Sequence, residues 1–258
     1  MLVAPCFVIS DVHLGHAPDD VERKLLGFLR WLPGQGGSLL INGDLFEFWF
    51  EWRTVVPRAG VRVLAALMDL RDAGVPMTMI AGNHDCWGGD VLRDAGVRFQ
   101  SGAWEGSLGG WRARVEHGDG LRDREDRGYR ALRRVLRNPL AIRAYRLLHP
   151  DLATRLALGS SKTSRDYQPR DEGRGLRDVA TSALAERADL ELLVYGHSHV
   201  PALERMATGA VYANAGSWLE APTYLVATPS RITLREWRGS AESTDLHALD
   251  RIAEEALP

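Results

Sequence analysis

The chain has 258 residues, of which 45% are hydrophobic and 26% charged, a composition that can bury the core of one α/β domain. Its 32 basic and 34 acidic residues give a formal net charge of −2, which excludes a protein that binds nucleic acid mainly by neutralising phosphates. The cysteines are Cys6 and Cys86, so we expect free thiols in a reducing compartment and no disulfide framework.

Short apolar runs bounded by glycines and polar residues predict strands along the chain. They occupy residues 3–10, 37–43, 76–82, 111–118 and 190–196. Between the first three runs lie two amphipathic helical patterns, Val21 to Leu32 and Val61 to Leu70. Strand, helix, strand, helix, strand predicts parallel pairing. Ligands then gather outside the carboxyl ends of the strands, where the polar residues of this chain fall.

The segment from Leu121 to Gly175 departs from this pattern, because its many arginines alternate with leucines and other apolar residues. Pro139 and Pro150 divide it, which predicts two or three short basic amphipathic helices inserted into the main fold. We therefore expect a core of residues 1–120 and 176–258 and a helical cap of residues 121–175. The alternative is a hairpin that only packs on the core.

The C-terminal part predicts further elements. From Tyr212 onward, short strand patterns suggest a meander in a second sheet, and Asp245 to Leu257 suggests a surface helix capped by Ser243 or Thr244. The N-terminus lacks a signal peptide pattern, and no stretch reaches the length of a membrane span. We expect a cytoplasmic protein, either soluble or attached at a membrane surface.

The strand ends carry metal-ligand side chains in the order D-x-H, G-D, G-N-H-D, H and G-H-x-H. They are Asp11, His13, Asp44, Asn83, His117, His197 and His199. Alternation along an extended segment would place the two members of each D-x-H or H-x-H pair on one side. Carboxylate, imidazole and amide donors suit manganese, iron, zinc or cobalt. Any one of these elements is weak evidence, but all five at strand ends predict a metal site.

With this pattern the sequence resembles the calcineurin-like metallophosphoesterases. The resemblance implies a four-layer α-β-β-α sandwich of two mixed sheets. It also implies one metal on Asp11, His13, Asp44 and His199 and a second on Asp44, Asn83, His117 and His197, with manganese favoured. Two ions that share Asp44 can stabilise both the attacking and the leaving oxygen at phosphorus. His84 is then a candidate proton donor to the leaving oxygen, and Asp85 a candidate to hold its ring.

The inserted segment is similar to the helical cap of UDP-2,3-diacylglucosamine diphosphatases of the lipid A pathway. This resemblance implies hydrolysis of a UDP-linked glycolipid to UMP and 2,3-diacylglucosamine 1-phosphate at the inner face of the cytoplasmic membrane. From the charge balance we expect no nucleic-acid partner, and we infer no obligate protein partner. Beyond Asn83, His84 and His197, the substrate contacts implied are Asp126, Tyr129, Ser160 and Ser164.

One departure concerns the substrate, because the best-known branch of these enzymes has Arg where this chain has His84. Two other functions compete with the lipid hydrolase. One is a soluble phosphodiesterase acting on a nucleotide or a general metallophosphoesterase, and the other is a non-enzymatic scaffold. The scaffold is disfavoured because every ligand position of the pattern is filled.

Overall fold

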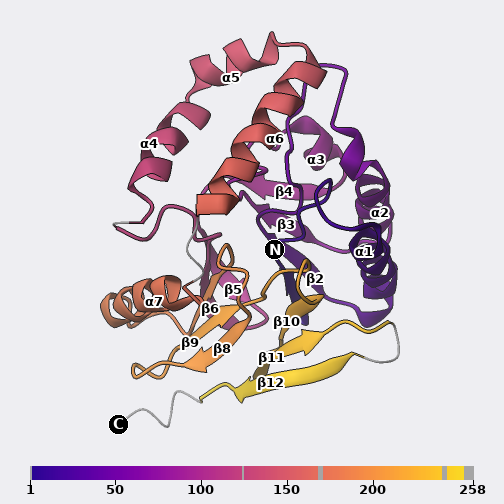
Figure 1. Cartoon of the computed structure of the whole chain (residues 1–258). Coiled ribbons are helices and arrows are strands. Elements are labelled where there is room, and N and C mark those ends of the chain that lie inside the picture. Colours follow the sequence, from indigo (N-terminus) through magenta and orange to yellow (C-terminus); the bar gives the residue numbers. More distant parts are fainter. Residues whose placement is uncertain (1, 124, 168–170, 240–242, 253–258) are drawn as a thin grey trace.

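In the computed structural model the described residues are 2–123, 125–167, 171–239 and 243–252, and in the last helix of the cap side chains are described as far as Gly159. Two sheets form the centre of the molecule (Figure 1). The larger sheet has the strand order β12-β11-β10-β1-β2-β3-β4 within these residues. Its strands are β1 (Cys6–Ile9), β2 (Ser38–Asn42), β3 (Met77–Ile80), β4 (Val97–Gln100), β10 (Thr223–Ala227), β11 (Arg231–Glu236) and β12 (Thr244–Asp250).

The smaller sheet has the order β5-β6-β7-β9-β8. Its strands are β5 (Trp104–Leu108), β6 (Trp111–Val115), β7 (Leu192–Tyr195), β8 (Ala202–Arg205) and β9 (Val211–Asn214). β1, β2, β3 and β4 are parallel, as are β6, β7 and β9, and both sheets have antiparallel strands at their margins. The predicted parallel pairing of the first three strands is confirmed.

Alternating side chains explain why the two sheets pack face to face. In β1, Phe7 and Ile9 point to the helical side, whereas Cys6 and Val8 lie in the core between the sheets. The helices α1 (Asp19–Trp31) and α2 (Val61–Asp72) cover the outer face of the larger sheet, and α3 (Asp90–Asp94) contacts β4. The helix α7 (Arg174–Glu186) buries Leu176, Ala180 and Leu184 on the outer face of the smaller sheet. The predicted four-layer α-β-β-α sandwich is confirmed.

Three helices follow one another in the segment expected to form the cap. They are α4 (Arg127–Leu136), α5 (Pro139–Arg146) and α6 (Pro150–Tyr167), and they arch over one end of the sandwich (Figure 1). Pro139 and Pro150 each stand at the first position of a helix, where a missing backbone N–H costs least. Asn138 caps α5 by accepting hydrogen bonds from the backbone N–H groups of Leu140 and Ala141.

The C-terminal expectations need correction. The expected helix from Asp245 is wrong, because Thr244–Asp250 forms β12 and pairs antiparallel with β11, while residues 253–258 lie outside the described part. The expected meander divides between the sheets: β9 joins the smaller sheet, but β10 and β11 extend the larger sheet beside β1. In both cases the secondary structure is determined by pairing with the edge of a sheet and not by the local sequence pattern.

Among the described residues, no helix combines the length and the apolar character needed to cross a bilayer.

Candidate metal centre

The candidate ligands follow directly on the strands that bring them together. Asp11 and His13 follow β1, Asp44 follows β2, and Asn83 follows β3 in the larger sheet. The remaining ligands come from the smaller sheet, where His117 follows β6 and His197 and His199 follow β7. The centre therefore lies at the carboxyl ends of parallel strands from both sheets, the usual place for a ligand in such folds.

One cluster contains Asp11, His13 and His199, whose ligand atoms all lie within 4.8 Å of one another. The Nε2 atom of His199 is 3.3 Å from Oδ1 of Asp11 and 3.1 Å from Nε2 of His13. The Nε2 atom of His13 is also 3.9 Å from Oδ2 of Asp44. Asp44 can therefore serve as a further ligand of this cluster.

A second cluster contains Asp44, His117 and His197, again with ligand atoms within 4.8 Å of one another. The Nε2 atom of His117 is 3.1 Å from Oδ2 of Asp44, and the rings of His117 and His197 are 5.3 Å apart. Asp44 thus stands between the two clusters. Asn83 follows β3, and its Oδ1 atom is buried without a hydrogen-bond partner among the described residues.

Five of these residues have backbone dihedral angles in the left-handed region, which orients their side chains toward the centre. The φ angle is 53° at Asp11, 54° at His13, 52° at Asp44, 60° at His197 and 62° at His199. The expected alternation along an extended strand is therefore the wrong reason for their approach, because β1 ends at Ile9 and β7 at Tyr195. Such backbone strain costs about 1–3 kcal/mol per residue and is typical of functional sites. Asp and His are among the side chains that tolerate this conformation best.

Glycines before the ligands leave room for close packing. A Cβ atom on Gly82 would collide with the carboxylate of Asp44, and one on Gly196 would collide with the side chains of Ser10 and Asp11. The glycines of the G-N-H-D and G-H-x-H motifs are therefore required, because the backbone at these two positions lies too close to neighbouring side chains to leave room for a Cβ atom.

Glu47 is a part of the centre that the sequence pattern missed. Its carboxylate is buried, and Oε2 lies 3.0 Å from Nδ1 of His13. Because a carboxylate at neutral pH only accepts, Nδ1 of His13 donates and Nε2 faces the cluster as a ligand atom. The backbone oxygen of Glu47 similarly lies 3.1 Å from Nδ1 of His84. A charged residue inside the apolar run LFEFWF was the available signal.

We expect Glu47→Gln to weaken divalent-metal binding by about 10–100-fold, because it removes the charge that supports His13 as a ligand. Calorimetric titration of the metal-free protein with Mn²⁺ measures this effect. Glu51→Gln is the matched control, since the Glu51 carboxylate accepts from the backbone of Gly89 and Val91 and contacts none of the proposed ligands. Equal Mn²⁺ affinity in the wild type and Glu47→Gln would contradict the supporting role.

Asp85 has a different role from the one expected. Its Oδ1 atom accepts hydrogen bonds from the backbone N–H groups of Gly82 and Asp44, and Oδ2 accepts from Phe46. The expectation that Asp85 holds the ring of His84 is wrong, since Nδ1 of that ring faces the carbonyl of Glu47. Asp85 instead joins the loops after β2 and β3. Burial and the nearby Asp44 raise its pKa to about 7.

The charges of the centre fit divalent cations. Burial alone would raise the pKa of Asp11, but His117 and His199 hold it at about 2, and the histidines around Asp44 hold its pKa well below the usual range. Burial would likewise lower the pKa of His117, yet Asp44 and Asp11 raise it well above its ordinary value. Buried carboxylates thus attract positive charge here, and Oδ1 of Asp11, like that of Asn83, has no hydrogen-bond partner among the described residues.

The donor atoms are oxygen and nitrogen, without a thiolate. Burial raises the pKa of the nearby Cys86 thiol to about 12, so it stays protonated. Mixed carboxylate, amide and imidazole donors suit manganese, iron, zinc or cobalt, and the residues present therefore fit a pair of such ions.

Of the cap residues expected to contact substrate, two make hydrogen bonds within the protein and two have side chains outside the described part. Asp126 is buried and accepts hydrogen bonds from the backbone and the guanidinium of Arg122. The Tyr129 hydroxyl donates to Asp119 across 2.6 Å, which fastens α4 to the loop that carries His117. Ser160 and Ser164 lie on α6, but their side chains are outside the described part.

The comparisons with known proteins agree with the geometry. The sequence model of the calcineurin-like phosphoesterases matches residues 4–201. A protein of Porphyromonas gingivalis named UDP-2,3-diacylglucosamine hydrolase is 31% identical over 242 residues, which cover 85% of this chain and 92% of that protein. A protein of Stenotrophomonas maltophilia with the same name is 33% identical over 227 residues, covering 82% and 90%.

Among solved structures, a dimetal phosphatase from Danio rerio has a similar fold. Its TM-score is 0.50 at 14% sequence identity, and the likeness covers 95% of this chain and 99% of that one.

Proposed function

This chain belongs to the calcineurin-like phosphoesterase family, and we propose that it hydrolyses the pyrophosphate of UDP-2,3-diacylglucosamine to UMP and 2,3-diacylglucosamine 1-phosphate. The chain is a metal-dependent hydrolase of phosphoester or pyrophosphate bonds. The observation that carries the proposal is the pair of candidate ligand clusters around Asp44, beneath a helical cap. The relatives named UDP-2,3-diacylglucosamine hydrolase, which match this chain over most of their length, support the choice of substrate.

We assign the ligands as follows. Asp11, His13, Asp44 and His199 would hold one ion, and Asp44, Asn83, His117 and His197 the other. Two divalent ions, with manganese favoured, supply positive charge that activates water and stabilises the attacking and leaving oxygens. The protein's part is to fix the donors. Left-handed backbone, glycine packing and the Glu47 carboxylate all hold ligand atoms in place before any ion binds.

His84 is the proposed proton donor to the leaving oxygen. One of its ligand-type atoms lies within 4.8 Å of those of His13 and Asp44, and its side chain is 10% exposed, so it borders the centre. The carbonyl of Glu47 fixes the proton on Nδ1, which leaves Nε2 to serve the substrate. The backbone N–H of His84 also donates to Oδ1 of Asp44 across 3.0 Å, which ties the proposed donor to the carboxylate that would be shared by the two ions.

The cap supports a lipid substrate, because the apolar side chains of α4 and α5 are not core. None of the residues of α4 or α5 is buried, and Leu140 and Leu147 are 70% and 88% exposed. The cap is nonetheless held firmly: the Trp87 indole donates to the carbonyl of Leu136 across 2.8 Å, and the ring of Tyr145 stacks on that of Trp87. An apolar surface fixed beside the centre suits acyl chains.

Polar replacement of Leu136, Leu140 and Leu148 should therefore raise the Michaelis constant for UDP-2,3-diacylglucosamine and leave hydrolysis of bis(4-nitrophenyl) phosphate unchanged. The exposed Leu246 of β12, which is 47% exposed, provides a control for the loss of a surface leucine away from the cap. Because no residue of α4 or α5 is buried and Leu148, which follows α5, is half-buried, the melting temperature should change little. Equal losses on both substrates with an unchanged melt would leave the lipid substrate without support.

We also propose that the arginines of the cap bind an anionic membrane surface. Arg133 and Arg137 already donate to backbone carbonyls, whereas Arg134 and Arg143 are exposed and make no ion pair among the described residues. Neutralising Arg134 and Arg143 should weaken binding to anionic vesicles by about 1 kcal/mol per charge. Sedimentation with vesicles measures it, and added salt should have the same effect on the wild type. Binding that resists both changes would exclude this surface.

A further inference from the structure

The cap is joined to the core by two stems. The first stem, residues 118–122, begins directly after the candidate ligand His117. A Cβ atom on Gly118 in this stem would lie 3.1 Å from a methyl carbon of Leu176 in α7 and 3.6 Å from the Cβ atom of His197. The first stem therefore packs against the helix that follows the cap and against a second candidate ligand.

The second stem, residues 171–173, returns to the core at the start of α7. Gly173 is the N-cap residue of that helix, and a Cβ atom on it would lie 3.3 Å from the Cβ atom of Val200 and 3.7 Å from Oγ of Ser198. Ser198 and Val200 flank the candidate ligand His199 in the sequence. Both stems thus lie against the loop that carries two candidate ligands, so the way the stems are joined sets how the cap stands over the centre.

Arg122 joins the two stems. Its Nη2 and Nε atoms donate to Oδ1 of Asp126 across 2.8 and 3.2 Å, and its backbone N–H donates to Oδ2 of the same carboxylate across 2.9 Å. Its Nη1 atom lies 3.6 Å from Oδ2 of Asp171 in the second stem. The Arg122 side chain is 11% exposed, so salt screens these charges less than those of a surface pair. Burial would lower the pKa of Arg122, but Asp126 and Asp171 raise it above its ordinary value, so the guanidinium stays charged.

Asp171 is in turn bound to the first turn of α7. Its Oδ1 atom accepts a hydrogen bond from the backbone N–H of Gly173 across 2.9 Å, and Oδ2 accepts one from Gly175 across 3.0 Å. A Cβ atom on Gly175 would lie 2.7 Å from Oδ2 of Asp171 and 2.8 Å from Cδ of Arg122, so this turn comes close to the ion pair. Since α7 buries Leu176 against the smaller sheet, the ion pair connects the start of the cap to the core.

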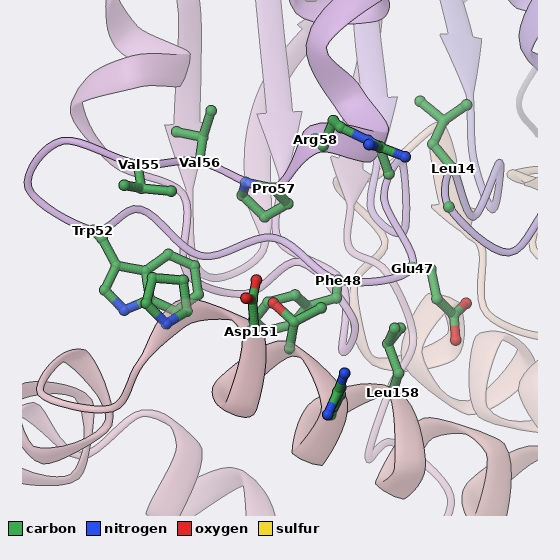
Figure 2. A pocket seen from close by; sticks show the side chains of 15 residues that line it. Leu14, Glu47, Phe48, Trp52, Val55, Val56, Pro57, Arg58, Asp151 and Leu158 are labelled. Carbon is green, nitrogen blue, oxygen red and sulfur yellow. The ribbon is translucent and has the colours of Figure 1, made fainter.

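The orientation of the cap sets the space between α6 and the core. These two parts form opposite walls of a pocket of about 600 Å³, and Figure 2 shows Asp151 and Leu158 of α6 turned toward the core. Glu47, the buried carboxylate of the metal centre, lines the same pocket, so this space reaches the centre. A rotation of the cap about its stems would therefore change the space through which the centre is reached.

We propose that Arg122 is a positioning residue for the hydrolysis, because it holds the two stems of the cap in the arrangement that substrate binding requires. Within the described part of the chain its guanidinium pairs with Asp126 and Asp171, so it acts through the cap and not on the phosphate. Both oxygens of Asp126 are bonded to Arg122, which places Asp126 in the same joint. The choice of UDP-2,3-diacylglucosamine as the assay substrate rests on the proposed function.

Arg122→Gln should raise the Michaelis constant for UDP-2,3-diacylglucosamine about tenfold, the order expected for the loss of a hydrogen bond between charged groups. The kcat, the hydrolysis of bis(4-nitrophenyl) phosphate and the Mn²⁺ content should stay unchanged, because the core holds the candidate ligands. Arg122→Lys should recover part of the loss, since it keeps the charge without the planar fork. Arg130→Gln is the matched control, because Arg130 of α4 pairs with Asp123 in the loop just before that helix.

A double variant tests whether the two stems are joined by this contact. Asp171→Asn should raise the same Michaelis constant, and adding it to Arg122→Gln should cause little further loss, because the contact between the two side chains is already broken. Fully additive losses would show that Arg122 and Asp171 act independently, which contradicts the joint.

Amide hydrogen exchange tests the joint without any turnover. The backbone N–H groups of Gly173 and Gly175, which donate to Asp171, should exchange faster in Arg122→Gln than in the wild type, and at the wild-type rate in Arg130→Gln. Unchanged exchange, or an unchanged Michaelis constant for the lipid substrate, overturns the positioning role. Equal losses on both substrates together with a loss of Mn²⁺ overturn it as well and make Arg122 a support of the metal centre. Faster exchange in Arg122→Gln, with no turnover of UDP-2,3-diacylglucosamine by the wild type, supports the joint and rejects the proposed substrate.

Discussion

Asp44→Ala should lose both metal ions and lower hydrolysis by on the order of 10³-fold or more, the scale expected when the main electrostatic stabilisation is removed. The reason is the position of its carboxylate, which lies 3.9 Å from the His13 ring nitrogen on one side and 3.1 Å from that of His117 on the other. Metal content per chain after dialysis against Mn²⁺, measured by elemental analysis, is the primary readout. Exhaustive chelation of the wild type should abolish activity in the same way.

His199→Ala provides the comparison for Asp44→Ala. His199 belongs to one cluster only and its side chain is 31% exposed, so this variant should lose one ion and keep the other. Two retained ions in Asp44→Ala would show that this carboxylate does not bridge. Asp44→Asn separates charge from shape, because an amide keeps the acceptor for the backbone N–H of His84.

His84→Ala should leave the metal content unchanged and lower turnover by about 10²–10⁴-fold, the usual contribution of a general acid. The side chain borders the centre, but the proposed ligand set is complete without it. The loss should be smallest for esters with good leaving groups, since a nitrophenolate departs without a proton. Steady-state rates on a pyrophosphate and on bis(4-nitrophenyl) phosphate, with metal analysis of the same samples, test this role.

Two results would argue against proton donation by His84. A loss of metal from His84→Ala would indicate that His84 is a ligand. Its place in a cluster with His13 and Asp44 provides this alternative. An equal loss of rate on both classes of ester would instead indicate a role in binding the phosphate group.

The strands and helices around the centre were predictable because their side chains repeat with a clear period. Phe7 and Ile9 alternate with Cys6 and Val8 as a strand between two layers requires, and the apolar faces of α1 and α2 are buried as expected. β12 was not predictable, since a short segment with Leu246 and Leu249 suits either a helix face or an edge strand. The free edge of β11, the strand just before it in the chain, decided it by antiparallel pairing.

The candidate ligand residues could be named from the sequence, but the backbone geometry that brings them together could not. The motif spacing predicted that Asp11 and His13 share one centre. The left-handed backbone that brings them together depends on the loop after β2, whose Gly43 and Asp44 carbonyls accept hydrogen bonds from the backbone N–H groups of Asp11 and His13. The partners of Glu47 and Asp85 are likewise set by tertiary contact. Residues that hold a ligand leave no fixed spacing, because they can come from any neighbouring loop.

The left-handed ligands also affect how this enzyme responds to selection in the laboratory. Glycine at His199, whose side chain is 31% exposed, would relieve backbone strain at little cost in packing, so the metal-free protein would gain heat resistance as it lost a candidate ligand. A screen for thermostable variants under chelating conditions would therefore enrich inactive sequences. The same screen in the presence of Mn²⁺ would reverse the preference, because the bound ions stabilise only the chains that can still hold them.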